Sequence, residues 1–333
     1  MSGDSSMSNT LAPAGADLYI TDRCGFNCQH CFLGNELNSG QQMSVEMVRA
    51  ITIFLRDANF EDITLLGGEP FQHAGLVNIV REVESAGLRC RIVTNGYRQA
   101  YKVLRSGLLP RDVELTFSVD GGHEDVHDGI RRRGSHSQLA ETSRLAREMG
   151  HATSAILSVS AQNAGDIART VAFCEEVGYS LLTVHHVTAR GNASRDSVLG
   201  EIEWRRVLQA LSSISNTTGM PIRCEDPFFS LEPGAPLKCA VRNRTNMMFF
   251  PDGRVYSCLL FINSEGGSGA FWDGTTVVQV VPRRGDLDAC LSARDSSSCP
   301  ASVVVRPALY PGVETTRIRC IYDKVPLVHG IPA

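Results

Sequence analysis

The chain of 333 residues alternates short apolar runs with stretches of helical periodicity from near residue 18 to about residue 214. Apolar residues spaced three and four apart predict amphipathic helices, and short apolar runs closed by glycine or polar residues predict buried strands. The predicted strands cover residues 18–21, 63–66, 90–94, 113–119, 153–159 and 181–187. The predicted helices cover residues 45–55, 74–86, 99–106, 137–149, 166–177 and 201–214. The pattern therefore contains six strand–helix units.

Such an alternation with short connections implies parallel strands joined by right-handed crossovers, and hence the α/β class. Six units are too few to close an eight-stranded barrel, so we expect a partial (β/α)6 TIM-like barrel. A doubly wound open sheet is the alternative architecture. In both architectures ligands bind at the carboxyl ends of the strands, and functional residues are expected there.

The composition excludes several classes of protein. Hydrophobic residues make up 43% of the chain and charged residues 20%, as in a globular protein, and a net charge of −4 gives no basic field for nucleic acid. No run of eighteen apolar residues is present, and residues 1–16 form a polar tail without the features of a signal peptide. We therefore expect a cytoplasmic protein that contacts neither a membrane nor nucleic acid.

Three cysteines, Cys24, Cys28 and Cys31, follow the first predicted strand in a C-x3-C-x2-C spacing. Soft thiolates bind zinc, copper(I) or iron–sulfur clusters, and three ligands leave a coordination position open or require a distant fourth partner. Buried core cysteines are the alternative, which the tight spacing disfavours. The chain has 11 cysteines, and in a reducing compartment such thiols bind metal more often than they form disulfides.

The second predicted strand ends in Gly67-Gly68-Glu69-Pro70. The glycines allow backbone to approach a ligand closely, the proline fixes the exit from the strand, and the glutamate supplies an acceptor for a cationic amine. An ordinary turn with a surface glutamate is the alternative reading of the same four residues.

Other strand ends carry polar side chains: Asn95, Ser118, Asp120 and the pair His185-His186. These groups are suited to the hydroxyls and amines of a nucleoside-like ligand, although each also fits a plain turn. Consecutive strand residues point to opposite faces, so only one of His185 and His186 is expected to face the barrel interior. Arg131 is suited to bind a carboxylate bidentately, or it belongs to a solvated run with its two neighbours.

The cysteine loop, the GGEP strand end and the six-unit alternation together resemble the radical S-adenosylmethionine (SAM) superfamily. This resemblance implies a [4Fe–4S] cluster held by Cys24, Cys28 and Cys31, with one iron left open for the amino and carboxylate groups of SAM. Reductive cleavage of SAM then yields methionine and a 5′-deoxyadenosyl radical that abstracts hydrogen from the substrate. A reductant such as flavodoxin or ferredoxin is implied as a partner.

The same resemblance implies roles for individual residues. Gly68 and Glu69 would contact the SAM amino group, with Gly67 beside them, and Phe26 would lie near the adenine. The remaining cofactor-binding positions are Asn95, Ser118 and Asp120, near the ribose or methionine portion, and Arg131. A catalytic acid or base, if the reaction needs one, is sought among Asp120, His185, His186 and Tyr256.

Periodicity changes near residue 220, which divides the chain into a tail (1–16), a barrel (17–219) and a C-terminal cysteine-rich domain (220–333). The spacing of three residues resembles the signature that opens a SPASM or twitch auxiliary-cluster domain. Thirteen residues separate Cys239 from Gly253, and four separate Gly253 from Cys258. The Pro251-Asp252-Gly253 turn between two β-type runs predicts a hairpin. Residues 118–121, 127–131, 134–135 and 190–193 are also similar to members with this extension.

The complete SPASM cysteine pattern is not present, so we expect one auxiliary [4Fe–4S] cluster, with two as the alternative. Cys239 and Cys258 are the first ligands by resemblance and Cys299 the next. The remaining candidates are Cys224, Cys290 and Cys320. Cys90 and Cys174 lie in apolar surroundings and are expected in the core.

Enzymes of this subgroup modify ribosomally made peptides by cross-linking, oxidation or epimerisation, or they oxidise small sugars, aminocyclitols and cofactor precursors. Peptide modification is our first expectation and the small-molecule reaction the alternative; a non-enzymatic zinc-binding module is a remote third. Only 23 residues precede Cys24, so we expect no fused leader-recognition domain, and a separate protein would supply that recognition.

Overall fold

The computed structural model describes residues 14–228, 246–258, 261–262, 270–279 and 325–326. The strands of the N-terminal part are β1 (Gly15–Thr21), β2 (Asp62–Gly67), β3 (Arg89–Thr94), β4 (Glu114–Ser118), β5 (Thr153–Val159), β6 (Leu182–His186) and β7 (Ile222–Cys224). The helices are α1 (Val45–Asp57), α2 (Leu76–Ser85), α3 (Arg98–Arg105), α4 (Glu124–Ile130), α5 (Ser135–Glu148), α6 (Ile167–Val177) and α7 (Glu201–Ser215). All six expected strand–helix units are present, and α4 is an additional short helix.

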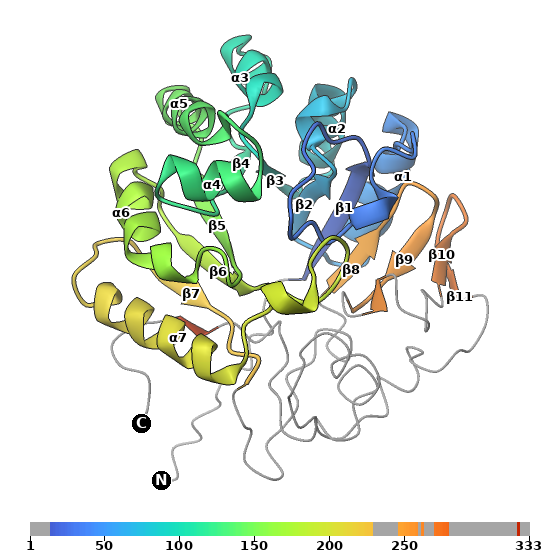
Figure 1. Ribbon diagram of the computed structural model, residues 1–333. Coiled ribbons are helices and arrows are strands. Elements are labelled where there is room, and N and C mark those ends of the chain that lie inside the picture. Colours follow the sequence, from blue (N-terminus) through green and yellow to red (C-terminus); the bar gives the residue numbers. More distant parts are fainter. Residues whose placement is uncertain (1–13, 229–245, 259–260, 263–269, 280–324, 327–333) are drawn as a thin grey trace, which may run out of the picture.

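Strands β1 to β7 are neighbours in chain order, and each pair is parallel. A doubly wound sheet reverses its strand order at a switch point, and this sheet does not. The partial-barrel prediction is therefore confirmed. Figure 1 shows the helices on the outside of the curved sheet, with β1 and β2 toward one end and β6 and β7 toward the other.

Local signals in the sequence explain several helix ends. Ser44 caps α1, since its side chain accepts a hydrogen bond from the backbone N–H of Met47 at 3.1 Å. Gly178 ends α6 in the left-handed conformation, with φ of 84°, which a glycine adopts without steric cost. Both features agree with the sequence pattern.

The C-terminal segments extend the same sheet at both edges. β8 (Asn246–Phe249) pairs in parallel with β1, and β9 (Arg254–Tyr256) pairs antiparallel with β8, which confirms the predicted hairpin. β10 (Ala270–Trp272) and β11 (Val277–Gln279) continue outward from β9. At the other edge, β12 (Val325–Pro326) pairs antiparallel with β7. The sheet therefore runs past residue 219, where periodicity had placed the domain boundary.

The strands separate two environments. Leu18, Ile20, Ile63 and Leu65 are fully buried in the core between the sheet and its helices, which also holds Cys90 and Cys174 as expected. The alternate residues of each strand face the inside of the curve. No helix within the described ranges is both long and apolar enough to cross a membrane.

Candidate functional site

A cavity of about 630 Å³ lies inside the curve of the sheet. It extends from inward-facing side chains of the strands to the loops at their carboxyl ends. Its lining includes the three cysteines of the loop, Arg131 at the end of α4, and the strand-end residues Gly67, Gly68, Glu69, Asn95, Ser118 and His185. The fold therefore brings most of the residues selected from the sequence to one cavity.

The cysteine loop is held in place by Asn38, a residue for which the sequence carries no functional signal. The backbone N–H of Cys24 donates to Oδ1 of Asn38 at 3.0 Å, and Nδ2 of Asn38 donates to the carbonyl of Cys24 at 3.2 Å. Asn38 itself has a positive φ of 62°, a conformation that asparagine tolerates better than most residues. This reciprocal pair fixes the start of the loop.

Residues 190–193 also hold the loop. The backbone N–H of Asn192 donates to the carbonyl of Cys31 at 2.9 Å, and its side chain donates to the carbonyl of Cys28 at 3.0 Å. The guanidinium carbon of Arg190 lies 5.4 Å from the ring centroid of Phe32. Gly191 has φ of 61°, and a Cβ there would lie 2.0 Å from the carbonyl oxygen of Cys31. The segment recognised only by resemblance therefore has a structural role at the loop.

The end of α4 contacts the same loop from a third side. The backbone N–H of Gln29 donates to the carbonyl of Ile130 at 3.0 Å, and its side chain donates to the carbonyl of Gly129 at 2.7 Å. Arg132 donates to the carbonyl of Gly25 at 2.7 Å. The short helix therefore positions the loop as well as Arg131.

The chemistry of the cysteines suits a soft metal centre. Burial raises the pKa of Cys24 to about 12 and that of Cys28 to about 11, so the free side chains are protonated at neutral pH. Coordination to metal deprotonates such thiols outright. Within the described residues, no three His, Cys, Asp or Glu side chains are grouped closely enough to hold a single metal ion. A four-iron cluster binds each cysteine at a different iron, so its ligands need not converge on one point.

The GGEP segment packs its backbone against that of the cysteine loop. The backbone N–H groups of Gly68 and Glu69 donate to the carbonyls of Thr21 and Arg23, both at 2.7 Å. A Cβ at Gly68 would lie 2.3 Å from the carbonyl oxygen of Arg23. This contact leaves no room for a side chain, so position 68 requires a glycine.

Glu69 is buried, with 3% of its surface exposed, and it still lines the cavity. Its carboxylate accepts hydrogen bonds from the backbone N–H groups of Asn95 (2.8 Å) and Phe71 (3.1 Å) and from the Thr94 hydroxyl (2.8 Å). Burial raises its pKa, and these hydrogen bonds act in the opposite direction. The carboxylate is thus fixed in orientation beside the cysteines.

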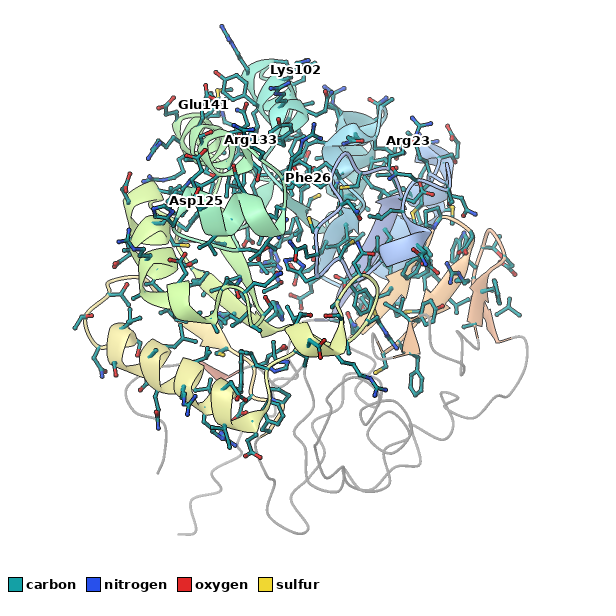
Figure 2. The ribbon with its side chains drawn as sticks, in the orientation of Figure 1. Arg23, Phe26, Lys102, Asp125, Arg133 and Glu141 are labelled. Carbon is teal, nitrogen blue, oxygen red and sulfur yellow. The ribbon has the colours of Figure 1, made fainter. Side chains whose placement is uncertain are left out.

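Phe26, expected near an adenine ring, is buried and lines the cavity. Its ring packs edge-on against Tyr97 at a centroid distance of 5.2 Å, and the guanidinium of Arg132 lies over both rings. Tyr97 was not selected from the sequence, because a tyrosine after a strand end carries no distinguishing signal. Figure 2 shows Phe26 beside α4 in this view.

Asp120 is not among the residues that line the cavity, unlike Asn95 and Ser118. Its carboxylate is fully buried and accepts from Nε of Arg131 at 2.5 Å, from Nε2 of His30 at 2.6 Å and from the backbone N–H of Ser158 at 3.1 Å. Burial opposes its ionisation, but the charges of Arg131 and His30 outweigh this and hold its pKa well below the usual range. Asp120 thus contacts two cavity-lining residues, and its direct contact with a ligand stays a prediction.

His185 and His186 point to opposite faces of β6, as consecutive residues of a strand do. His185 lines the cavity, and its Nδ1 lies 3.3 Å from Oε2 of the buried Glu225. His186 faces the other way, where its ring packs against Trp204 and Phe228 and Nε2 donates to the carbonyl of Leu199 at 2.9 Å. Tyr256 is buried in the hairpin and is not among the cavity-lining residues. Of these three catalytic candidates, only His185 faces the cavity.

The deeper part of the cavity has a polar lining. One register position of the first four strands is occupied by Asp17, Thr64, Arg91 and Glu114. Arg91 donates to Glu114 at 2.7 Å, and the hydroxyls of Thr116 and Ser154 lie 2.9 Å apart. The interior of a closed TIM barrel is typically filled by branched apolar side chains. Polar side chains here surround open space.

The auxiliary-cluster candidates are only partly described. Cys258 follows β9 and is half-buried against the core. Cys224 is buried in β7, where burial raises its pKa, and its Sγ lies 3.3 Å from the carbonyl of Glu225. Cys239, Cys290, Cys299 and Cys320 lie outside the described residues. The auxiliary ligand set therefore stays a prediction.

Comparison with known proteins shows what this chain is similar to. Residues 18–174 match the family model described as the Radical SAM superfamily. Mycofactocin maturase MftC of Mycolicibacterium smegmatis is 23% identical over 305 residues, covering 86% of this chain and 77% of MftC. The subtilosin biosynthesis protein AlbA of Bacillus subtilis is 26% identical over 159 residues, covering 46% of this chain and 35% of AlbA.

A solved structure shares the fold. Streptococcus suis SuiB bound to S-adenosylmethionine matches with a TM-score of 0.64 at 16% identity, covering 76% of this chain and 62% of SuiB. SuiB has also been solved bound to the precursor peptide SuiA. The chain spans about a third of AlbA and less than two thirds of SuiB.

Proposed function

We propose that this chain is a radical SAM enzyme that modifies a ribosomally made peptide by radical chemistry, a proposal supported by the match of residues 18–174 to the Radical SAM superfamily model. Cys24, Cys28 and Cys31 would hold a [4Fe–4S] cluster. When bound, the cluster and SAM supply one-electron chemistry able to remove a hydrogen atom from an unactivated C–H bond. The observation that carries the proposal is that the three cysteines share one cavity with Glu69 and the strand ends.

The residues around the cavity would bind and orient SAM. Glu69, fixed by its three hydrogen bonds, presents a carboxylate to the SAM amino group, and Gly68 permits close approach of the backbone. Asn95 and Ser118 offer hydrogen bonds to the ribose or methionine portion. Phe26 offers an apolar ring to the adenine, and Arg131 a cation to the carboxylate.

The peptide substrate is supported by the relatives. AlbA is a bacteriocin biosynthesis protein, MftC a maturase and SuiB a protein solved with its precursor peptide. We propose cross-linking, oxidation or epimerisation as the net reaction, with flavodoxin or ferredoxin as reductant and a separate protein for leader recognition. One auxiliary cluster, with Cys239 and Cys258 among its ligands, would accept an electron in a net oxidation.

The polar depth of the cavity supports a second candidate, a hydrophilic small molecule such as a sugar or aminocyclitol. Thr64, Thr116 and Ser154 offer hydroxyls, and Arg91 and Glu114 offer charged groups. A peptide would satisfy the same lining only by inserting a polar side chain. The two candidates therefore share one cavity and differ in what enters it.

Coexpression with candidate peptides distinguishes the peptide substrate from the small-molecule substrate. The chain is produced anaerobically with each short peptide encoded beside its gene, and the peptides are examined by mass spectrometry. We expect one peptide to change mass, and the change to be absent with Cys28→Ala. If SAM is cleaved while every such peptide stays unmodified and a sugar or aminocyclitol is oxidised instead, the second candidate replaces the first.

A further inference from the structure

A buried ionic network lies directly behind the cysteine loop. Oδ2 of Asp120 accepts from both Arg131 and His30, and Oδ1 accepts from the backbone N–H of Ser158. The Asp120 side chain is fully buried, and the side chains of Arg131 and His30 are 9% and 12% exposed. These three residues lie on three separate parts of the barrel: the cysteine loop, the end of β4 and the end of α4.

The network fixes the direction of the guanidinium. Nε of Arg131 is bound to Asp120, and Nη1 on the opposite side points to Sγ of Cys28 at 4.0 Å. A guanidinium is planar and rigid, so fixing one nitrogen fixes the others. The side chain therefore places an N–H and a positive charge against one of the cysteines that would bind the cluster.

We propose that Arg131, positioned by Asp120, raises the reduction potential of the cluster held by Cys24, Cys28 and Cys31. This inference rests on the proposed function, because it concerns the same cluster. Asp120 is a positioning residue here, and its role is to keep the cation facing Cys28.

The physical reason is that reduction adds a negative charge to the cluster. A positive charge and a hydrogen-bond donor beside a ligand sulfur stabilise the reduced state more than the oxidised state. The effect is strong in a buried site, where water does not screen the charge. Asp120 partly offsets the charge, but its carboxylate lies at the Nε side of the guanidinium, away from the Nη1 that faces sulfur.

The experiment is an anaerobic redox titration of reconstituted full-length protein without SAM, followed by electron paramagnetic resonance. The signal that changes on later addition of SAM identifies the cluster concerned. Arg131→Gln should lower the equilibrium constant for its one-electron reduction about tenfold or more, which corresponds to about 59 mV. Arg131→Lys keeps the positive charge but loses the planar guanidinium with its several N–H donors. This variant should lower the reduction potential by less than Arg131→Gln does.

Removal of Arg131 alone leaves the buried Asp120 without its main partner, which threatens folding. The double variant Asp120→Asn with Arg131→Gln removes both charges together, and its potential should still be lowered, by less than in Arg131→Gln alone. Arg133→Gln is the matched control, because Arg133 is exposed two residues away and is labelled near α4 and α5 in Figure 2. The control should keep the wild-type potential.

The outcomes separate the two proposals. Suppose that the wild-type protein assembles its cluster and cleaves SAM, and that the double variant has the same iron content and the same reduction potential as wild type. This result would overturn the inference about Arg131 and leave the proposed function standing. A potential lowered equally by Arg133→Gln would also overturn it, because the effect would then be one of net charge. A wild-type protein that assembles no cluster would overturn both.

Discussion

The side chain of Asn192 donates a hydrogen bond to the carbonyl oxygen of Cys28 at 3.0 Å, although the two residues are 164 positions apart in the chain. Its backbone N–H donates to the carbonyl of Cys31 at 2.9 Å. The segment after β6 thus holds the loop after β1 from across the cavity. The shape of the cysteine loop therefore depends on the hydrogen bonds from Asn192, which form only when the curved sheet brings the ends of β1 and β6 together.

Gly191→Ala should disturb this contact. The added Cβ would lie 2.0 Å from the carbonyl of Cys31, and φ of 61° costs a non-glycine residue about 1 kcal/mol or more. We expect iron content after anaerobic reconstitution to fall, with helix content by circular dichroism unchanged. Gly165→Ala is the control, since a Cβ there meets nothing within 4 Å. Full iron loading of the Gly191 variant would show that the contact does not shape the loop.

Glu69→Gln should weaken SAM binding. Glutamine keeps the size of the side chain but loses the charge that would pair with the SAM amino group, and a hydrogen bond to a charged group contributes about 1.5–3 kcal/mol. We expect the dissociation constant for SAM, measured by equilibrium dialysis on reconstituted protein, to rise about tenfold or more. The exposed Glu141, labelled in Figure 2, provides the control Glu141→Gln. Unchanged SAM affinity of the Glu69 variant would remove this residue from the binding site.

His185 and His186 should respond oppositely to substitution. His186→Ala removes a ring packed on Trp204 and its hydrogen bond to Leu199, and should lower the free energy of unfolding by about 2–3 kcal/mol. His185→Ala should change stability much less but reduce product formation, because its side chain faces the cavity. Denaturant titration and product analysis measure the two effects. The reverse pattern would contradict the assigned orientations.

Stability should fall as the pH is lowered below about 6.5. Burial, joined by the charge of Arg131, lowers the pKa of His127 from 6.5 to about 3. Between these values the unfolded chain binds a proton that the folded chain does not, so unfolding becomes easier by at most about 1.4 kcal/mol per pH unit for this group. Above pH 6.5 the group contributes no pH dependence.

The variant His127→Asn isolates this effect, because the asparagine Oδ1 replaces Nδ1 as acceptor for the backbone N–H of Asp120. The free energy of unfolding of wild type and variant is compared at pH 5 and pH 7. The pH dependence should be weaker in the variant. Identical slopes would mean that His127 is not kept neutral by the fold.

Much of the barrel was predictable from the pattern of apolar residues. Buried parallel strands appear as short apolar runs, and amphipathic helices as apolar residues spaced three and four apart. β5 was expected at 153–159 and lies there, and the hairpin across Gly253 was marked by its turn residues. α4 was missed because its seven residues are too few to show a period. β7 was missed for the same reason, since it has three residues.

The candidate site was predictable as far as it follows strand ends. Glu69, Asn95 and Ser118 reach the cavity because the carboxyl ends of parallel strands meet at one edge. Asp120 also follows a strand end, but the chain turns there so that its carboxylate faces Arg131 and His30. Asn38 and Tyr97 had no signal, because their importance comes from contacts made only in the folded chain.

The most direct test of the account is reductive cleavage of SAM by anaerobically reconstituted protein, with 5′-deoxyadenosine measured against iron and sulfide content. We expect an iron–sulfur protein that forms 5′-deoxyadenosine, and loss of this product when Cys24, Cys28 or Cys31 is replaced by alanine. Arg133→Gln, on the exposed surface, should leave the yield unchanged. A colourless protein that binds zinc and leaves SAM intact would contradict the account.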